Sequence, residues 1–104
     1  MTTIFTENPK LATTAAELLK ALGHPLRLRI IALLANKEAS VNELVEQLDV
    51  KQPIVSQQLR ILRLSGLVES RREGGYSAYF LMKPHLKNML SCIEGCLDSR
   101  GGEL

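Results

Sequence analysis

Two thiols stand near the end of the chain at a spacing that allows joint chemistry. Cys92 and Cys96, the only cysteines, are four residues apart in the sequence CIEGC. On a helix, side chains at this spacing share one face, so two thiolates can bind one soft metal ion. The same spacing is unfavourable for a disulfide within one helix. The alternative is that both side chains only pack, since unligated cysteine is often buried.

A second group of side chains, between positions 51 and 72, has the types that bind DNA. Five basic residues stand there with one acid, whereas residues 36–49 carry four acids and one base. Basic charge confined to one segment is typical of a phosphate-binding surface, and glutamine amides can bond to adenine. The alternative is a solvated helix face, because a net charge of +2 on the whole chain indicates no particular partner.

The elements that must position these groups are short helices with clear end signals. Apolar residues recur at helical spacing between the signals, which predicts five helices in all. The start and stop signals are Asn8-Pro9 with Gly23, His24-Pro25, Ser40 with Glu43 as a capping box, Pro53 with Gly66, and Lys83-Pro84.

The apolar period changes after Gly66. VESRR and SAYFL read as two strands, and Gly74-Gly75 between them supplies the positive φ angles of a hairpin turn. Two short helices joined by the turn DVK precede this hairpin, which is the layout of a winged helix-turn-helix. We therefore predict a mainly α fold of about five helices with a β-hairpin wing.

The second helix of such a unit enters the major groove, and its first residues meet base edges. Its inward side is predicted to hold Ile54, Leu59 and Leu62, with Val55 as a further candidate. Arginines further along the helix suit phosphates, and the hairpin tip suits the backbone or a minor groove. The predicted DNA-binding residues are Lys51, Gln52, Pro53, Ser56, Gln57, Gln58, Arg60, Arg63, Arg71, Arg72, Gly75 and Tyr76.

The stretches ALGHPLRLRIIALL and SVNELVEQLDVKQPIVSQQLRILRLSGLVESRREGGYSAYFL resemble the ArsR/SmtB family of bacterial winged-helix repressors. The resemblance covers about Leu18 to Leu97. It implies a homodimer, formed through the first and last helices, on a short and partly palindromic operator of double-stranded DNA. Family members typically release DNA when they bind a metal ion, a metalloid or another inducer. The chain departs from the family at Lys51, where a capping Ser or Thr is common, and at Gln57-Gln58, where His is frequent.

Three effector sites of the family can be compared with this chain. The thiolates of the metalloid site are replaced by Ser40 and Asn42, and the second-helix cysteine of redox-sensing members by Ala32. The zinc-site positions of the last helix hold Lys83, His85, Cys96 and Ser99, of which two are poor ligands. Cys92 and Cys96 therefore remain as the candidate effector site, with His85 as a further ligand. Thiolates of two subunits would suit arsenic(III), cadmium, zinc or copper(I).

Length and composition indicate one domain over residues 1–104, with a core of about 10–98 and a frayed tail at 99–104. No membrane span or secretory signal is visible, so a cytoplasmic protein is expected. The same DNA-binding role without a cysteine sensor stays open. A winged-helix module that binds protein is a third hypothesis, for which the acids Glu43 and Glu46 leave room. An enzyme is not expected, because neither a phosphate loop nor a catalytic pair is present.

Overall fold

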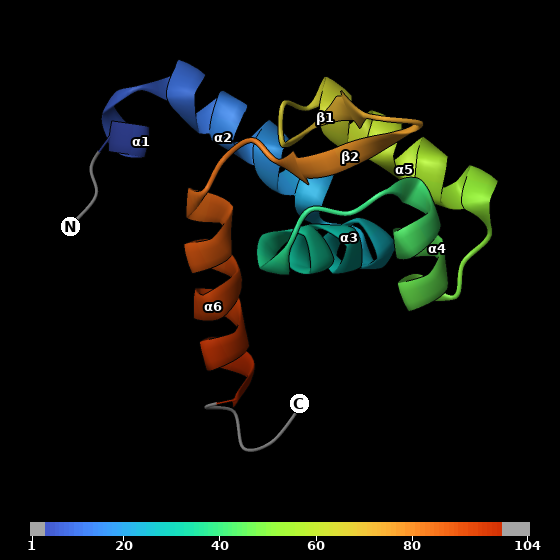
Figure 1. Cartoon of the computed structure of the whole chain (residues 1–104). Coiled ribbons are helices and arrows are strands. Elements are labelled where there is room, and N and C mark those ends of the chain that lie inside the picture. Colours follow the sequence, from blue (N-terminus) through green and yellow to red (C-terminus); the bar gives the residue numbers. More distant parts are fainter. Residues whose placement is uncertain (1–3, 99–104) are drawn as a thin grey trace.

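A computed structural model describes residues 4–98 of the chain (Figure 1). This part contains six helices and one antiparallel hairpin, so the fold is mainly α as predicted. The helix that was not predicted is the first, a single turn. The elements are α1 (Ile4–Glu7), α2 (Pro9–Leu22), α3 (Pro25–Asn36), α4 (Val41–Leu48), α5 (Gln52–Leu64), β1 (Val68–Glu73), β2 (Tyr76–Leu81) and α6 (His85–Asp98). The predicted tail, 99–104, lies outside the described residues.

Two of the helices, α2 and α3, begin after residues whose side chains accept backbone hydrogen bonds. Asn8 accepts from the Leu11 N–H (3.1 Å) ahead of α2, and His24 Nδ1 accepts from the Leu26 N–H (3.1 Å) ahead of α3. Such caps satisfy donors that a helix start would otherwise leave unpaired. The predicted start signals of α2 and α3 are therefore confirmed, and His24 has a structural role.

A capping box starts α4, the first helix of the helix-turn-helix. Ser40 Oγ accepts from the Glu43 N–H (3.2 Å), and the Ser40 N–H donates to the Glu43 carboxylate (2.8 Å). The second hydrogen bond holds the pKa of Glu43 below its ordinary value of 4.5. This interaction fixes the first turn of α4 next to the loop that leaves α3.

The core is built around α3, which lies in the middle of the molecule and contacts α2, α4, α5, α6 and β2 (Figure 1). Ile30 and Ile31 of α3 are fully buried, as are Leu44 of α4 and Leu62 of α5. Truncating a buried leucine to alanine typically destabilises a protein by about 2–5 kcal/mol. This shared core holds α4 and α5 in a fixed orientation, so the outer side of α5 is a rigid surface.

The inward side of α5 differs from the predicted one. Val55, Leu59 and Leu62 are buried, but Ile54 is 43% exposed, so the prediction that Ile54 faces inward is wrong. The fourth buried residue is Gln58, which completes the helical spacing of i, i+3, i+4 and i+7 from Val55. The buried side of the helix is otherwise as predicted: Leu59 and Leu62 face the core, and Val55 takes the inward position at its start instead of Ile54.

The wing is a two-stranded antiparallel hairpin in which Val68 pairs with Leu81 and Glu73 with Tyr76. Its turn is Gly74-Gly75, as predicted, although only Gly74 has a positive φ (66°). A further antiparallel bridge joins the wing to the loop between α3 and α4. There the Ala39 N–H donates to the Tyr79 carbonyl (3.1 Å) and the Tyr79 N–H donates to the Ala39 carbonyl (2.8 Å).

The last helix, α6, leaves the body after its first turns and projects away from it (Figure 1). Leu86 is its only buried residue, and every residue from Ser91 to Asp98 is exposed. Among residues 4–98, no helix is both long enough and apolar enough to cross a membrane.

Candidate nucleic-acid interface

The start of α5 presents three polar side chains outward. Gln52 and Gln57 are exposed and Ser56 is half-buried, with the exposed ring of Pro53 beside them. Gln52 Nε2 donates to Ser56 Oγ (2.8 Å), which orders the two side chains as one polar unit. Lys51 precedes the helix, is exposed, and makes no capping hydrogen bond with its side chain. Its ammonium cannot accept from backbone N–H groups, so it stays available to a phosphate.

Gln58 does not belong to this surface, which corrects its prediction as a DNA-binding residue. Only 9% of it is exposed. Its Oε1 accepts from Arg27 Nη1 of α3 (3.0 Å), and Arg27 Nε donates to the Ala21 carbonyl at the end of α2 (2.6 Å). The physical reason is pairing: a buried amide is stable only when it is hydrogen-bonded, and Arg27 supplies the donor. Gln58 therefore joins α5 to α3 and α2.

The two arginines along α5 differ in their surroundings. Arg60 is exposed on the outer side of the helix. Arg63 forms an ion pair with Glu69 of β1, at 3.1 Å from Nη2 to Oε1. Because a phosphate would have to compete with that carboxylate, Arg60 is the better placed of the two for a backbone contact.

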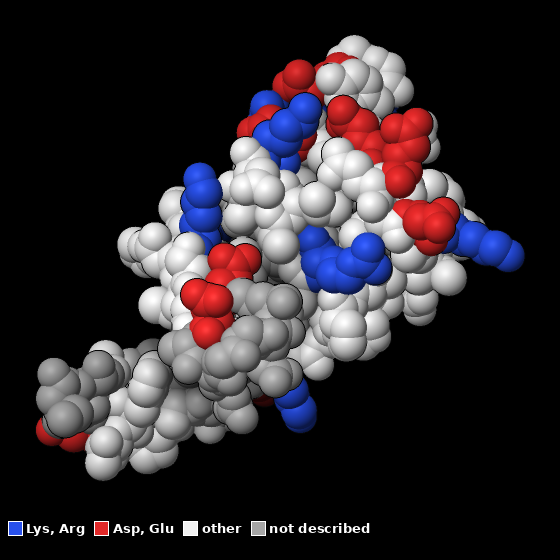
Figure 2. Space-filling model, turned by 90° about the horizontal axis from the view of Figure 1, so that it is seen from below, with Lys and Arg blue, Asp and Glu red and all other residues white. Residues whose placement is uncertain are grey.

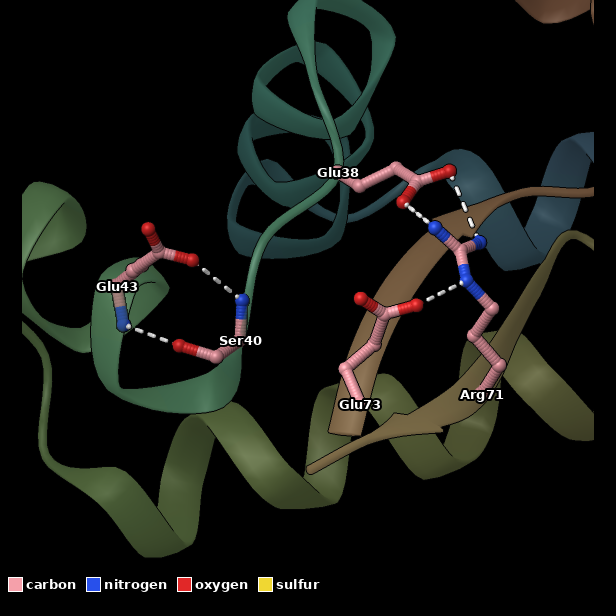
Figure 3. Close-up of polar contacts among 5 residues, drawn as sticks. All are labelled: Glu38, Ser40, Glu43, Arg71 and Glu73. Carbon is pink, nitrogen blue, oxygen red and sulfur yellow. Dashed lines mark hydrogen bonds and ion pairs between the residues drawn. The ribbon is translucent and has the colours of Figure 1, made fainter. Parts of the chain in front are cut away.

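The two arginines of the wing differ even more. Arg71 donates from Nη1 to Glu38 Oε2 (3.1 Å), from Nη2 to Glu38 Oε1, and from Nε to Glu73 Oε2 (2.7 Å) (Figure 3). These carboxylates, Glu38 foremost, raise the pKa of Arg71 further above its usual value. Arg72 points to the other side of the strand and is exposed, with no ion pair to any residue in 4–98.

Gly75 and Tyr76 lie at the tip of the wing, and Tyr76 is 53% exposed. They are therefore accessible to a partner, as the prediction requires. Away from the tip, charges are mixed. The face in Figure 2, seen from below the view of Figure 1, shows Lys and Arg side chains scattered singly among Asp and Glu. This face offers no broad basic patch, so the outer side of α5 and the wing remain the candidate interface.

Comparisons with known proteins decide the family. The model of the arsR family of bacterial regulatory proteins matches residues 24–70, from the start of α3 into β1. A biofilm growth-associated repressor from Agrobacterium fabrum is 43% identical over 84 residues, which are 81% of this chain and 72% of that protein. This chain belongs to the arsR family. It is a DNA-binding transcriptional regulator, as predicted, and not an enzyme.

Solved structures agree with this assignment. The transcriptional repressor BigR from Xylella fastidiosa superposes with a TM-score of 0.73 at 35% identity, covering 92% of this chain and 95% of that one. The homodimeric winged helix-turn-helix DNA-binding domain Mb0332 from Mycobacterium bovis superposes with a TM-score of 0.79 at 28% identity, covering 88% and 85%. The winged-helix prediction is thereby confirmed.

The predicted effector residues of this arsR-family chain lie on α6. Cys92 and Cys96 are exposed, and so is His85 at the start of the helix. Residues 4–98 contain no group of three or more His, Cys, Asp or Glu side chains that could hold a metal ion. One protomer thus offers two thiols but not a full ligand set. Ser99, compared above with a zinc ligand, lies outside the described part of the chain.

A hollow of about 180 Å³ separates α3 from α6. Ala32, which stands where redox-sensing relatives have a cysteine, lines it on the α3 side, and Leu90 and Ser91 line it on the α6 side. The thiols of Cys92 and Cys96 are not part of this lining. Because both cysteines are on α6, a disulfide between α3 and α6 cannot form within one chain, and any thiol chemistry would use the exposed side of α6.

Arg27 and Glu38 support the elements of this interface, and the sequence did not indicate either of them. Each acts on a residue 31 or 33 positions away, Gln58 and Arg71 respectively. No local pattern signals such a pair, because its members meet only in the folded chain.

Proposed function

We propose that this protein represses transcription as a homodimer bound to a partly palindromic operator. The observation that carries the proposal is the outer side of α5, where Gln52, Ser56 and Gln57 form a polar surface on a helix held rigidly by the core. In a winged helix-turn-helix this surface enters the major groove. The bacterial chromosome lies in the cytoplasm, which is where such a regulator would work.

The contacts divide by chemistry. Gln57 is the candidate for base reading, since a glutamine amide can bond to the N6 and N7 edge of adenine. Lys51, Arg60 and Arg72 are the candidates for phosphate contacts, because each is exposed and basic. Phosphate contacts position the protein and carry no sequence information directly, so the two groups are separable by experiment.

The apolar surface supports a dimer. Large side chains stay exposed on α1, α2 and the outer half of α6, among them Phe5 (50%), Leu19 (57%) and Ile93 (40%). A second copy of the chain is the proposed occupant, because Mb0332, a similar structure, is a homodimer. Two-fold symmetry would set paired recognition helices about 34–36 Å apart, which is one turn of DNA.

Selection of duplexes from a random pool, followed by anisotropy titration, tests the DNA proposal. We expect a partly palindromic sequence to be enriched, and its affinity to fall steeply with salt, by about 0.9 in the log–log slope for each phosphate contact. Arg60→Ala should weaken all duplexes alike and reduce that slope by about one contact. A flat salt dependence, or no enriched sequence, would contradict the proposal.

Sedimentation at several protein concentrations tests the dimer. Ile93→Gln should weaken self-association by about tenfold or more, since apolar side chains in the centre of an interface contribute most of its affinity. Ile54→Gln is the matched control, because Ile54 is an isoleucine of similar exposure (43%) on α5, a helix that the proposed dimer interface does not use. Equal dissociation constants for the two variants would rule out α6 as the interface.

We further propose that a soft metal ion, a metalloid or a thiol oxidant weakens operator binding through Cys92 and Cys96. Both thiols are exposed one turn apart on α6, and a dimer would supply the additional ligands that one protomer lacks. Operator titrations with arsenite, cadmium, zinc, copper(I) or a mild oxidant would compare the wild type with a Cys92→Ser/Cys96→Ser variant. Identical responses would assign the cysteines to packing.

A further inference from the structure

All three nitrogens of the Arg71 guanidinium donate hydrogen bonds to carboxylates. Nη1 and Nη2 donate to Glu38 in a bidentate arrangement, and Nε donates to Glu73 (Figure 3). The same guanidinium lies 5.3 Å from the centre of the Phe80 ring on β2. A planar arginine that is bidentate to one acid and stacked on an aromatic ring has little orientational freedom. Arg71 is therefore ordered within the protein without any DNA.

The partner that matters most, Glu38, does not belong to the wing. It lies in the loop between α3 and α4, directly before Ala39, which bridges to Tyr79, and Ser40, which caps α4. Three consecutive residues thus bind the wing through a side chain, bind it through the backbone, and start the first helix of the helix-turn-helix. The position of the wing relative to α4 is set at this one junction.

Neighbouring residues of β1 point to opposite sides of the hairpin. Arg71 shares its side with the acids Glu69 and Glu73, whereas Arg72 lies on the other side. A phosphate approaching Arg71 would meet two carboxylates bound to it and a third nearby, which repel the phosphate. Arg72 meets no such barrier, so the two adjacent arginines have different tasks.

We propose that Arg71 is a positioning residue that fastens the wing to the loop before α4 through Glu38, and that the wing contacts DNA through Arg72 instead. This inference rests on the proposed operator binding. The side chains of Arg71 and Glu38 are about half exposed (48% and 45%), so solvent screens the pair and its contribution to overall stability is small. Its effect is on where the wing lies.

Glu38→Gln gives opposite results for the two roles of Arg71. If Arg71 contacted a phosphate, removal of its acidic competitor would tighten operator binding. If Arg71 fastens the wing, the same change loosens the wing, and binding weakens by about two- to fivefold. Glu46→Gln is the matched control, because it removes one exposed acid of α4 and so makes the same change in net charge. Tighter binding by Glu38→Gln than by Glu46→Gln would overturn the proposal.

Arg71→Lys provides a second variant. Lysine keeps the positive charge that a phosphate needs but cannot form the bidentate pair with Glu38. We expect the affinity to fall as in Glu38→Gln, with the salt slope unchanged, whereas Arg72→Ala should reduce the slope by about one phosphate contact. Wild-type affinity in Arg71→Lys would assign Arg71 to DNA.

Hydrogen exchange of the Tyr79 amide tests the same inference without DNA. This N–H donates to the Ala39 carbonyl (2.8 Å) and so reports whether the wing stays joined to the loop. Its exchange should be faster in Glu38→Gln and Arg71→Lys, and unchanged in Glu46→Gln. If no duplex is bound by the wild type, the proposed function fails while this result still decides the role of Arg71; unchanged exchange in all variants would overturn it.

Discussion

Gln57 and Gln58 are adjacent and chemically identical, but one is exposed and the other buried, so together they test which residues of α5 face outward and which face the core. Gln57 is exposed towards the proposed DNA, and Gln58 is buried against Arg27. Replacing each by alanine, one at a time, removes the same amide group. The expected losses differ in kind: operator discrimination for Gln57→Ala and folding stability for Gln58→Ala.

The magnitudes follow from the contacts. In Gln58→Ala, Arg27 loses the acceptor of a charged hydrogen bond of 3.0 Å, and such a loss costs about 2 kcal/mol in the free energy of unfolding. For a domain of this size that corresponds to a Tm lowered by about 8–16 °C. In Gln57→Ala the stability change should stay within about 0.5 kcal/mol. Loss of one bidentate base contact should reduce the preference for the best operator by about tenfold.

The assay is thermal and urea unfolding at one fixed protomer concentration, because the stability of a dimer depends on that concentration. Operator preference is measured as the ratio of affinities for the selected duplex and a single-base variant. A stable Gln58→Ala protein combined with an unstable Gln57→Ala protein would refute the orientation of α5. A Gln57→Ala variant with unchanged preference would refute the assignment of base reading.

Two further predictions concern helix starts. Lys51→Ser supplies the missing cap of α5 and should raise the free energy of unfolding by about 0.5–1 kcal/mol. The same change should weaken operator binding at low salt. A decrease in both the free energy of unfolding and the operator affinity would show that Lys51 stabilises the fold. Ser40→Ala removes one hydrogen bond of the capping box and should lower the free energy of unfolding by about 1 kcal/mol. Because the pKa of Glu43 is lowered from 4.5, its contribution is present above about pH 4.5 and is lost as the pH falls through its folded-state pKa. Urea unfolding as a function of pH should therefore show a weaker acid dependence in Glu43→Gln than in the wild type, and equal dependence would contradict the cap.

The order of the elements was predictable because their ends carry local signals. Asn8, His24 and the Ser40–Glu43 pair each satisfy backbone groups within a few residues of themselves. The turn at Gly74 and the stop at Gly66 need positive φ angles, which glycine adopts readily. These interactions join residues that are close in the sequence, so they can be predicted from local sequence patterns.

The buried side of α5 was predicted except at two residues, Ile54 and Gln58. Ile54 and Val55 are both apolar, so hydrophobic spacing alone does not say which of them faces the core. The buried face of α5 includes a polar residue, Gln58, which hydrophobic spacing does not predict to be inward. Its burial is explained by its hydrogen bond with Arg27. The spacing of Val55, Leu59 and Leu62 was the signal that could have corrected the prediction.

The candidate site was predictable as a segment but not as individual roles. Residue types and spacing placed the interface on α5 and the wing. They assigned the same role to Arg71 and Arg72, because the acid that binds Arg71 is 33 residues away in the sequence. Charge patterns identify which groups are basic, whereas the fold decides which of those charges are already neutralised.

The outer half of α6 is exposed from Ser91 to Asp98. If it forms the proposed dimer, operator occupancy depends on the cellular concentration of the chain. If the DNA-binding form is a pair of chains, its abundance at low expression rises with the square of the number of chains in the cell. Halving synthesis would then reduce operator occupancy by up to about fourfold. A promoter regulated by the dimer would therefore respond more steeply to changes in the concentration of this protein than a promoter regulated by a monomer.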